Sequence, residues 1–141
     1  MMNSEPSLNE NYPPRRSRLL WAIIILGLVG FFDAAFLTVE HYLGAVPPCS
    51  VVNGCETVLT SSYATIGFVP VALFGAIYYA AIFLFALRAN HIWLRRLTTI
   101  GFLATLYFLY LQFFVIQAIC LYCLLSAVVT ITIFVLAWRH N

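Results

Sequence analysis

Four apolar stretches, separated by short polar segments, dominate the hydrophobic pattern of the chain. They run over about residues 19–39, 66–87, 97–117 and 120–138. Each is close to the roughly 20 residues that an α-helix needs to cross the hydrocarbon core of a bilayer. The pattern predicts an all-α integral membrane protein, a four-transmembrane-helix bundle with a cysteine-bearing outer loop between helices 1 and 2.

The polar ends of the chain fall outside this bundle. Residues 1–18 are rich in Asn, Ser and Pro and end in arginines, so we predict a disordered cytosolic tail. Residues 139–141 form a short cytosolic C-terminal tail. A single membrane domain, residues 19–138, then has to hold the whole function.

The composition and the placement of the charges support this interpretation. The chain is 63% hydrophobic and 9% charged, whereas a soluble domain is about 25% charged. All seven basic residues are arginines, and with four spans they fall on one side, in the segments 15–18, 88–96 and 139. The positive-inside rule therefore predicts that both termini are cytosolic. Because the arginines adjoin apolar stretches, we interpret them as topology signals and expect no nucleic-acid partner.

The four cysteines form two pairs on the predicted non-cytosolic side, where disulfides form and persist. Cys49 and Cys55 lie in a Pro- and Gly-containing segment, and Cys120 and Cys123 open the fourth apolar stretch. Cysteines three apart on a helix share a face, and a helix N-terminus favours thiolate over thiol. The Cys120–Cys123 pair therefore has the features of a redox-active centre.

Three interpretations of the cysteines are open. They could form two structural disulfides, a four-thiolate zinc site, or a thiol–disulfide relay from the loop pair to the membrane pair. The Cys49–Cys55 spacing is wider than is usual for zinc pairs, so we expect no metal. A relay needs a two-electron acceptor, and the chain has no GxGxxG dinucleotide fingerprint. A lipid-soluble quinone fits this requirement.

Several motifs around the cysteines are typical of one family. They are Phe32–Thr38 with Glu40-His41-Tyr42, Gly54–Tyr63, Gly67–Gly75 and Cys120-Leu-Tyr-Cys123. In these motifs, over nearly all of residues 19–138, the chain resembles the bacterial branch of the vitamin K epoxide reductase family. The resemblance implies a four-helix bundle around a quinone of the ubiquinone or menaquinone type, in a stand-alone protein without a fused thioredoxin-like domain.

The resemblance also implies roles for individual residues. Cys123 would face the quinone, and Cys120 would be its exchange partner. Cys49 and Cys55 would be the shuttle pair, with Cys55 meeting the partner protein and Cys49 relaying to Cys120. Ser61 would lie near the quinone, and it could also act as an N-cap before the second span, since the two roles are compatible.

Two departures from the family pattern bear on substrate and partner. Animal members carry Thr-Tyr-Ala shortly after the CxxC, where this chain has Ser126-Ala127-Val128. This difference argues against assigning the epoxide reduction of the animal members to this chain. Some bacterial relatives carry a fused thioredoxin-like domain, whereas this chain ends at Asn141. We therefore expect a separate DsbA-like or thioredoxin-like partner. The expected location is the bacterial inner membrane, in contact with lipid, with the active site facing the periplasm or exterior.

Two rival functions are a DsbB-like oxidase, whose two cysteine pairs occur in the reverse order, and a non-enzymatic four-span protein with structural disulfides. Among other polar residues, Asp33 within the first span either assists proton or thiol chemistry or makes a polar contact inside the bundle. Gln112 and Gln117 are candidates for hydrogen bonds between helices.

Overall fold

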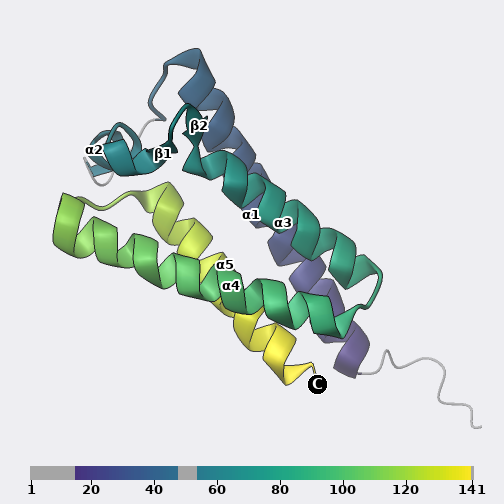
Figure 1. Cartoon of the computed structure of the whole chain (residues 1–141). Helices are drawn as coiled ribbons and strands as arrows, with labels where there is room; N and C mark the ends of the chain where they lie inside the picture. The colour runs from purple at the N-terminus through teal and green to yellow at the C-terminus, as the bar shows by residue number, and fades with distance from the viewer. Residues whose placement is uncertain (1–14, 48–53, 141) are drawn as a thin grey trace, which may run out of the picture.

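The computed structural model of the protein describes residues 15–47 and 54–140, and its main body is built from four long helices (Figure 1). These are α1 (Arg15–Leu43), α3 (Val71–Leu87), α4 (His91–Tyr110) and α5 (Leu121–Arg139). A π-helical segment, η2 (Leu111–Ile116), extends α4. The predicted all-helical character is confirmed.

A compact cap lies between α1 and α3 in the chain. It consists of the short helix α2 (Gly54–Leu59), the 3-10 turn η1 (Ser62–Ala64) and an antiparallel hairpin of β1 (Thr65–Ile66) and β2 (Val69–Pro70). Gly67 lies in the hairpin turn with a φ of 65°, a backbone conformation that glycine adopts without steric cost. The predicted outer loop is therefore a folded cap in the part that the structure describes.

The helix bounds correct several details of the sequence prediction. Residues 15–18, expected to belong to a disordered tail, lie in the helix α1. The expected second span, 66–87, begins only at Val71, because residues 65–70 form the hairpin. The expected basic loop over 88–96 is also shorter, since α4 begins at His91 with Asn90 as its N-cap accepting from the Trp93 N–H.

Three of the described helices, over Ser17–Leu43, His91–Ile116 and Leu121–Arg139, are long and apolar enough to cross a membrane. The fourth, α3, has 17 residues and a length of about 25 Å. The protein thus has three to four apolar helices of membrane-spanning character.

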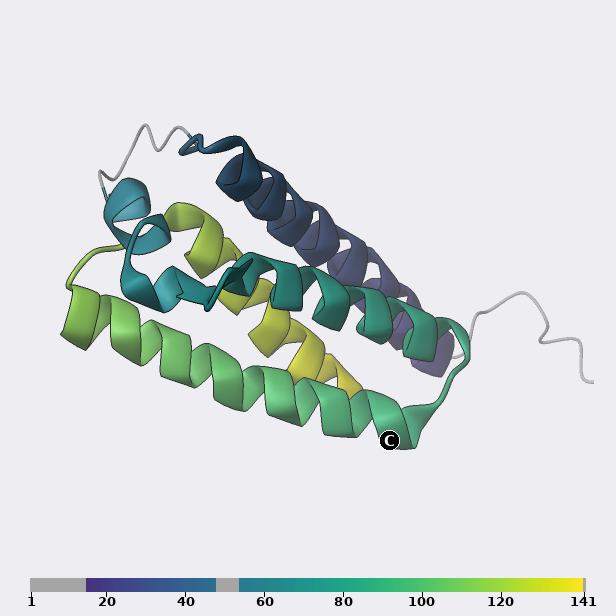
Figure 2. The ribbon, with the colours of Figure 1, turned by 45° about the horizontal axis from the view of Figure 1, so that its top comes forward.

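The bundle is held together around Tyr79, which is 1% exposed. Helix α1 packs along α3 (Figure 2), and both α1 and α4 pack on α5. The Tyr79 hydroxyl lies 2.9 Å from the Ser126 carbonyl oxygen, 2.7 Å from the Ser126 hydroxyl and 2.8 Å from the Thr130 hydroxyl. The Tyr79 ring fills the space beside Gly30 of α1, where any Cβ would collide with it. One side chain of α3 therefore joins α1 to α5.

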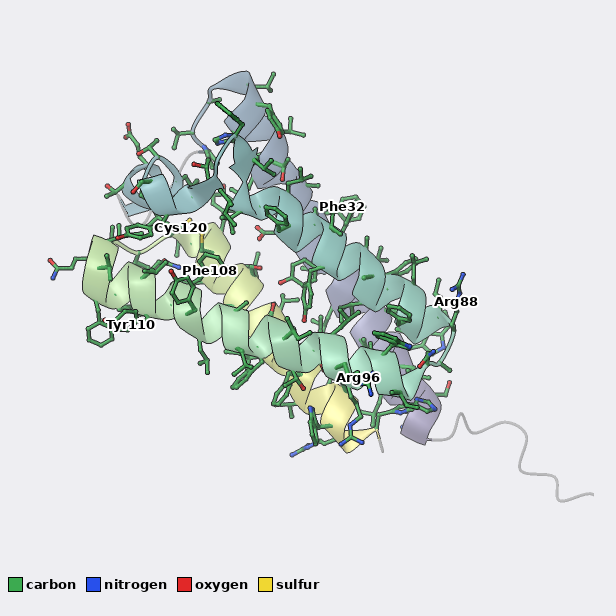
Figure 3. All side chains as sticks on the ribbon, viewed as in Figure 1. Phe32, Arg88, Arg96, Phe108, Tyr110 and Cys120 are labelled. Atoms are coloured by element: carbon green, nitrogen blue, oxygen red, sulfur yellow. The ribbon has the colours of Figure 1, made fainter. Side chains whose placement is uncertain are left out.

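The arginines and the CxxC lie at opposite ends of the bundle. The start of α1, the α3–α4 turn and the end of α5 gather at one end, and the cap and the start of α5 lie at the other (Figure 1). Arg88 and Arg96 belong to the first end, and Cys120 to the second (Figure 3). This is the polarity that the arginine pattern predicts.

The close approach of α1 to Tyr79 predicts the effect of adding a methyl group. Gly30→Ala should destabilise the protein by about 1–3 kcal/mol, because the ring must move in a packed core. Gly27→Ala is the matched control, since its Cβ would meet its nearest neighbour, Ile82 Cγ2, at 3.7 Å. Thermal unfolding in detergent should show a lower midpoint for Gly30→Ala alone, and equal midpoints for the two variants would contradict this packing.

Candidate redox site

A cavity of about 680 Å³ opens between the cap and the helices at the end that holds the CxxC. Its size falls in the range of pockets for small ligands and cofactors. Residues of α1, the cap, α3, α4, η2 and α5 line it. Much of its wall is apolar, including Leu37, Phe74, Phe108, Leu109 and Ile116. Such a cavity suits an apolar ring system better than a charged metabolite.

A few polar groups face this apolar space. Asp33 of α1 and Tyr78 of α3 line the cavity, and each has a buried oxygen, Asp33 Oδ2 and the Tyr78 hydroxyl, without a hydrogen-bond partner. Buried polar atoms are normally hydrogen-bonded. Their orphan oxygens therefore mark the cavity as a place where a ligand with polar atoms can complete the bonding.

The CxxC lies at the N-terminus of α5, as predicted. Cys120 is the N-cap residue and is fully buried, while Cys123 lies on the first helical turn and lines the cavity. Both are free thiols. The backbone N–H of Cys120 donates to Gln112 Oε1 at 3.0 Å. The two sulfurs thus differ in access, because Cys123 lines the cavity and Cys120 is enclosed by protein.

Cys55 of α2 lies against the CxxC. Cys55 is 1% exposed and shares a buried apolar cluster with Val58 and Cys120, against which Tyr122 and Cys123 pack. Cys55 is disulfide-bonded, and Cys49 lies outside the described residues. Cys55 is buried beside Cys120, and the order in which the two loop cysteines meet the partner protein and Cys120 stays a prediction.

A glycine makes this contact between α2 and the CxxC possible. Gly54 packs against the backbone of Ile119, and any Cβ at Gly54 would collide with the Ile119 carbonyl and amide. Gly54 immediately precedes Cys55, and Ile119 immediately precedes Cys120. The backbone contact therefore places the two cysteines in the same cluster.

Ser61 lines the cavity. Its hydroxyl donates to the Val58 carbonyl oxygen at 2.7 Å. It is the N-cap residue of the turn η1 but makes no side-chain cap bond, and the helix α3 of the second span has Pro70 as its N-cap instead. The hydroxyl oxygen can still accept a hydrogen bond from a ligand.

The environment of Cys120 favours its thiolate. A hydrogen bond from the Cys123 thiol lowers the pKa of Cys120 to about 7, and the backbone N–H groups of Cys123 and Tyr122 add to this effect. Burial acts in the opposite direction, since it disfavours the charged form. In the reduced pair, negative charge therefore collects on Cys120, and the Cys123 thiol keeps its proton to make the bond.

Sequence reasoning missed some of the residues that build the site. Tyr78, Tyr79 and Thr130 read as ordinary members of apolar helices, and only tertiary packing brings their hydroxyls to the cavity. The expected bond of Gln112 is made to the linker before α5 instead of to a helix. Gln117 is exposed and has a left-handed backbone with a φ of 56°. Four aromatic side chains near the end of α4 and in η2 are exposed: Tyr107, Tyr110, Phe113 and Phe114.

Comparison with known families decides what this site belongs to. The family model described as the vitamin K epoxide reductase family matches residues 21–138. The chain belongs to the vitamin K epoxide reductase family. As a member, it is a membrane thiol oxidoreductase, which favours this assignment over the DsbB-like and the non-enzymatic alternatives. No curated protein matches the chain in a direct search.

The contact between Gly54 and Ile119 predicts that Cys55 is shielded from thiol reagents. Gly54→Ala should lift α2 from the linker, so that Cys55 of the reduced protein reacts with a maleimide about tenfold faster. Thr57→Ala, an exposed change on the same helix, should leave the rate unchanged. Peptide mass spectrometry identifies the labelled cysteine, and slow labelling of Cys55 in Gly54→Ala would contradict the contact.

The bond between the two thiols predicts a pH dependence. In a reduced background that lacks Cys49 and Cys55, thiolate absorbance should rise at a lower pH than for an ordinary cysteine, because a hydrogen bond from the Cys123 thiol lowers the pKa of Cys120. Cys123→Ala removes the donor, so the pKa of Cys120 should rise and the transition should move to higher pH. A transition that is unchanged by Cys123→Ala would show that another group sets the pKa.

Proposed function

We propose that the protein is a quinone-dependent thiol oxidoreductase that supports disulfide-bond formation. The single observation that carries the proposal is the series of three cysteines. Cys55 and Cys120 are buried in one cluster, and Cys123, which packs against that cluster, lines the cavity. Thiol–disulfide exchange needs sulfurs in contact, so this series can carry electrons from the cap to the cavity.

The cavity residues fit a quinone. A quinone has a flat apolar ring with two carbonyl oxygens, and the cavity offers apolar walls together with polar groups that lack partners. Phe108, Leu109 and Ile116 would hold the ring, and Tyr78 could donate to an oxygen. When bound, a quinone of the ubiquinone or menaquinone type would accept two electrons and two protons from the protein.

Each cysteine of the chain has its own role in the successive exchange steps. A reduced partner thiolate attacks the disulfide of the loop pair and leaves oxidised, which reduces Cys49 and Cys55. The Cys55 thiolate then attacks Cys120 of the oxidised CxxC, which forms a Cys55–Cys120 disulfide and frees Cys123. Cys49 attacks Cys55, re-forms the loop disulfide and releases Cys120. Two electrons have then moved from the loop pair to the CxxC.

The low pKa of Cys120 suits the last of these steps. A thiol of lower pKa is a better leaving group in disulfide exchange, and the Cys123 thiol stabilises the departing Cys120 thiolate by a hydrogen bond. Release of Cys120 is therefore favoured near neutral pH. Cys123, on the cavity wall, is left as the sulfur that delivers electrons out of the protein.

The same proposal sets the membrane arrangement. All four long helices cross the bilayer. Helix α3, which is shorter than the others, spans the hydrocarbon core together with the hairpin. The arginine-bearing end and both termini face the cytosol, and the cap faces the periplasm or exterior of a bacterial inner membrane. A DsbA-like or thioredoxin-like protein on that side supplies the thiols to be oxidised.

Quinone reduction by the purified protein tests this function. With a reduced DsbA-like donor, the wild type should reduce a soluble ubiquinone analogue, and Cys123→Ser should lose at least about a hundredfold in rate, because no sulfur remains at the cavity. Cys49→Ser and Cys55→Ser should fail with the protein donor but keep activity with a small dithiol that reduces the CxxC directly.

The donor comparison provides the control, since each loop variant is active with one donor and inactive with the other. Full activity of Cys123→Ser with the protein donor would contradict the scheme. Loss of both activities in Cys55→Ser, with the fold intact, would show that the loop pair does more than shuttle electrons.

A further inference from the structure

Gln112 contacts both the CxxC and the cavity, because its side chain bonds Cys120 and it lines the cavity wall. It is 4% exposed, lines the cavity and belongs to the π-helical segment η2. Single π-helical turns are rare in proteins overall, but those that occur are often found at functional sites. Here the segment ends the long α4 helix where the chain turns toward α5, so the position of Gln112 is set by the local backbone.

Both oxygens of Gln112 hold the linker that leads to the CxxC. Its backbone carbonyl accepts from the Ala118 N–H at 3.1 Å, and its side-chain Oε1 accepts from the Cys120 N–H at 3.0 Å. The linker contains Gln117 in a left-handed conformation, which for a residue other than glycine is a strained state that its surroundings must stabilise. Gln112 supplies part of that stabilisation.

The bond to Cys120 also fixes the orientation of the Gln112 amide. A backbone N–H can only donate, so the side-chain atom that receives it has to be the oxygen. The other end of the amide is then an NH2 group with two donor hydrogens, and no hydrogen bond of this group occurs among the described residues. Because Gln112 lines the cavity, this donor is available to a ligand there.

Several other hydroxyls of the cavity are already engaged, whereas the Tyr78 hydroxyl has no partner among the described residues. Ser61 gives its hydrogen to the Val58 carbonyl. The Tyr79 hydroxyl donates to the Ser126 carbonyl oxygen and is also hydrogen-bonded to the hydroxyls of Ser126 and Thr130. Gln112 differs from all of them because its side chain bonds the backbone of the CxxC itself.

We propose that Gln112 is a positioning and specificity-determining residue that binds a carbonyl oxygen of the electron acceptor with its side-chain N–H while its side-chain oxygen holds Cys120. This inference rests on the proposed function and names the acceptor feature that the site selects. A buried polar donor left without its partner is costly, so the site discriminates against ring compounds that lack the carbonyl. One amide thus links acceptor recognition to the placement of the thiol pair.

The test compares two probes of the same ring shape. Menadione carries the carbonyl oxygens, and methylnaphthalene lacks them. Binding is measured on the full-length oxidised protein in detergent, which has no electrons to give. The wild type should prefer menadione, and Gln112→Met should reduce that preference roughly tenfold, as expected for loss of one buried hydrogen bond, while methylnaphthalene binding changes less than about twofold.

The redox equilibrium of the CxxC supplies a second readout that needs no acceptor. Gln112→Met removes the bond to Cys120, so the equilibrium of the Cys120–Cys123 pair with dithiothreitol should shift several-fold. Val115→Met is the matched control, because Val115 is an exposed residue of the same η2 segment and does not line the cavity. It should change neither the probe preference nor the equilibrium. Gln112→Leu repeats the test with a different apolar side chain, should Gln112→Met fold poorly.

The outcomes separate this inference from the proposed function. An unchanged preference for menadione in a folded Gln112 variant overturns the inference, even where the wild type reduces quinone. Equal weakening of both probes also overturns it, because it indicates a change of cavity shape. Failure of the wild type to reduce any quinone overturns the proposed function instead, whatever the probe binding shows.

Discussion

The contact between the cap and the linker before α5 is the constraint on which the redox site depends. Gly54 and Ile119 touch backbone to backbone, with no room for a side chain at Gly54. Each is followed by a cysteine, so the contact brings Cys55 and Cys120 into one buried cluster. Sulfur-to-sulfur exchange requires such proximity, and no disulfide between these residues is needed to maintain it.

The second condition is a mainly apolar cavity that also contains polar groups able to bind a ligand. Tyr79 ties α1, α3 and α5 together and satisfies the hydroxyls of Ser126 and Thr130. This leaves Asp33 Oδ2 and the Tyr78 hydroxyl without hydrogen-bond partners in the described part of the chain. Such groups are costly in a bundle that no ligand enters. Their presence is understandable if a ligand with polar atoms uses them.

Much of this arrangement could be predicted from the sequence, because it depends on local features. The long apolar stretches gave the helices, and the CxxC at the start of the last stretch placed Cys120 at a helix N-terminus. The hairpin was missed because Ile66, Phe68 and Val69 continue the apolar pattern of α3, and short apolar runs do not distinguish strand from helix.

The relation between the cysteine pairs could not be predicted, because it depends on tertiary contacts. Cys55 and Cys120 are far apart in the chain, and a loop position suggests exposure. The structure instead buries Cys55, since the backbone at Gly54 can approach Ile119. The role of Gln112 was equally hidden, because the π-helical segment that positions it has no clear sequence signal. Its side-chain bond was expected, but its partner was not.

The order of the loop cysteines is the central claim, and a trapped disulfide tests it most directly. When Cys49 and Cys123 are both replaced by serine, mild oxidation should join Cys55 to Cys120, as peptide mass spectrometry would show. When Cys55 and Cys123 are replaced instead, Cys49 should not reach Cys120. A disulfide between Cys49 and Cys120, with none between Cys55 and Cys120, would contradict the account.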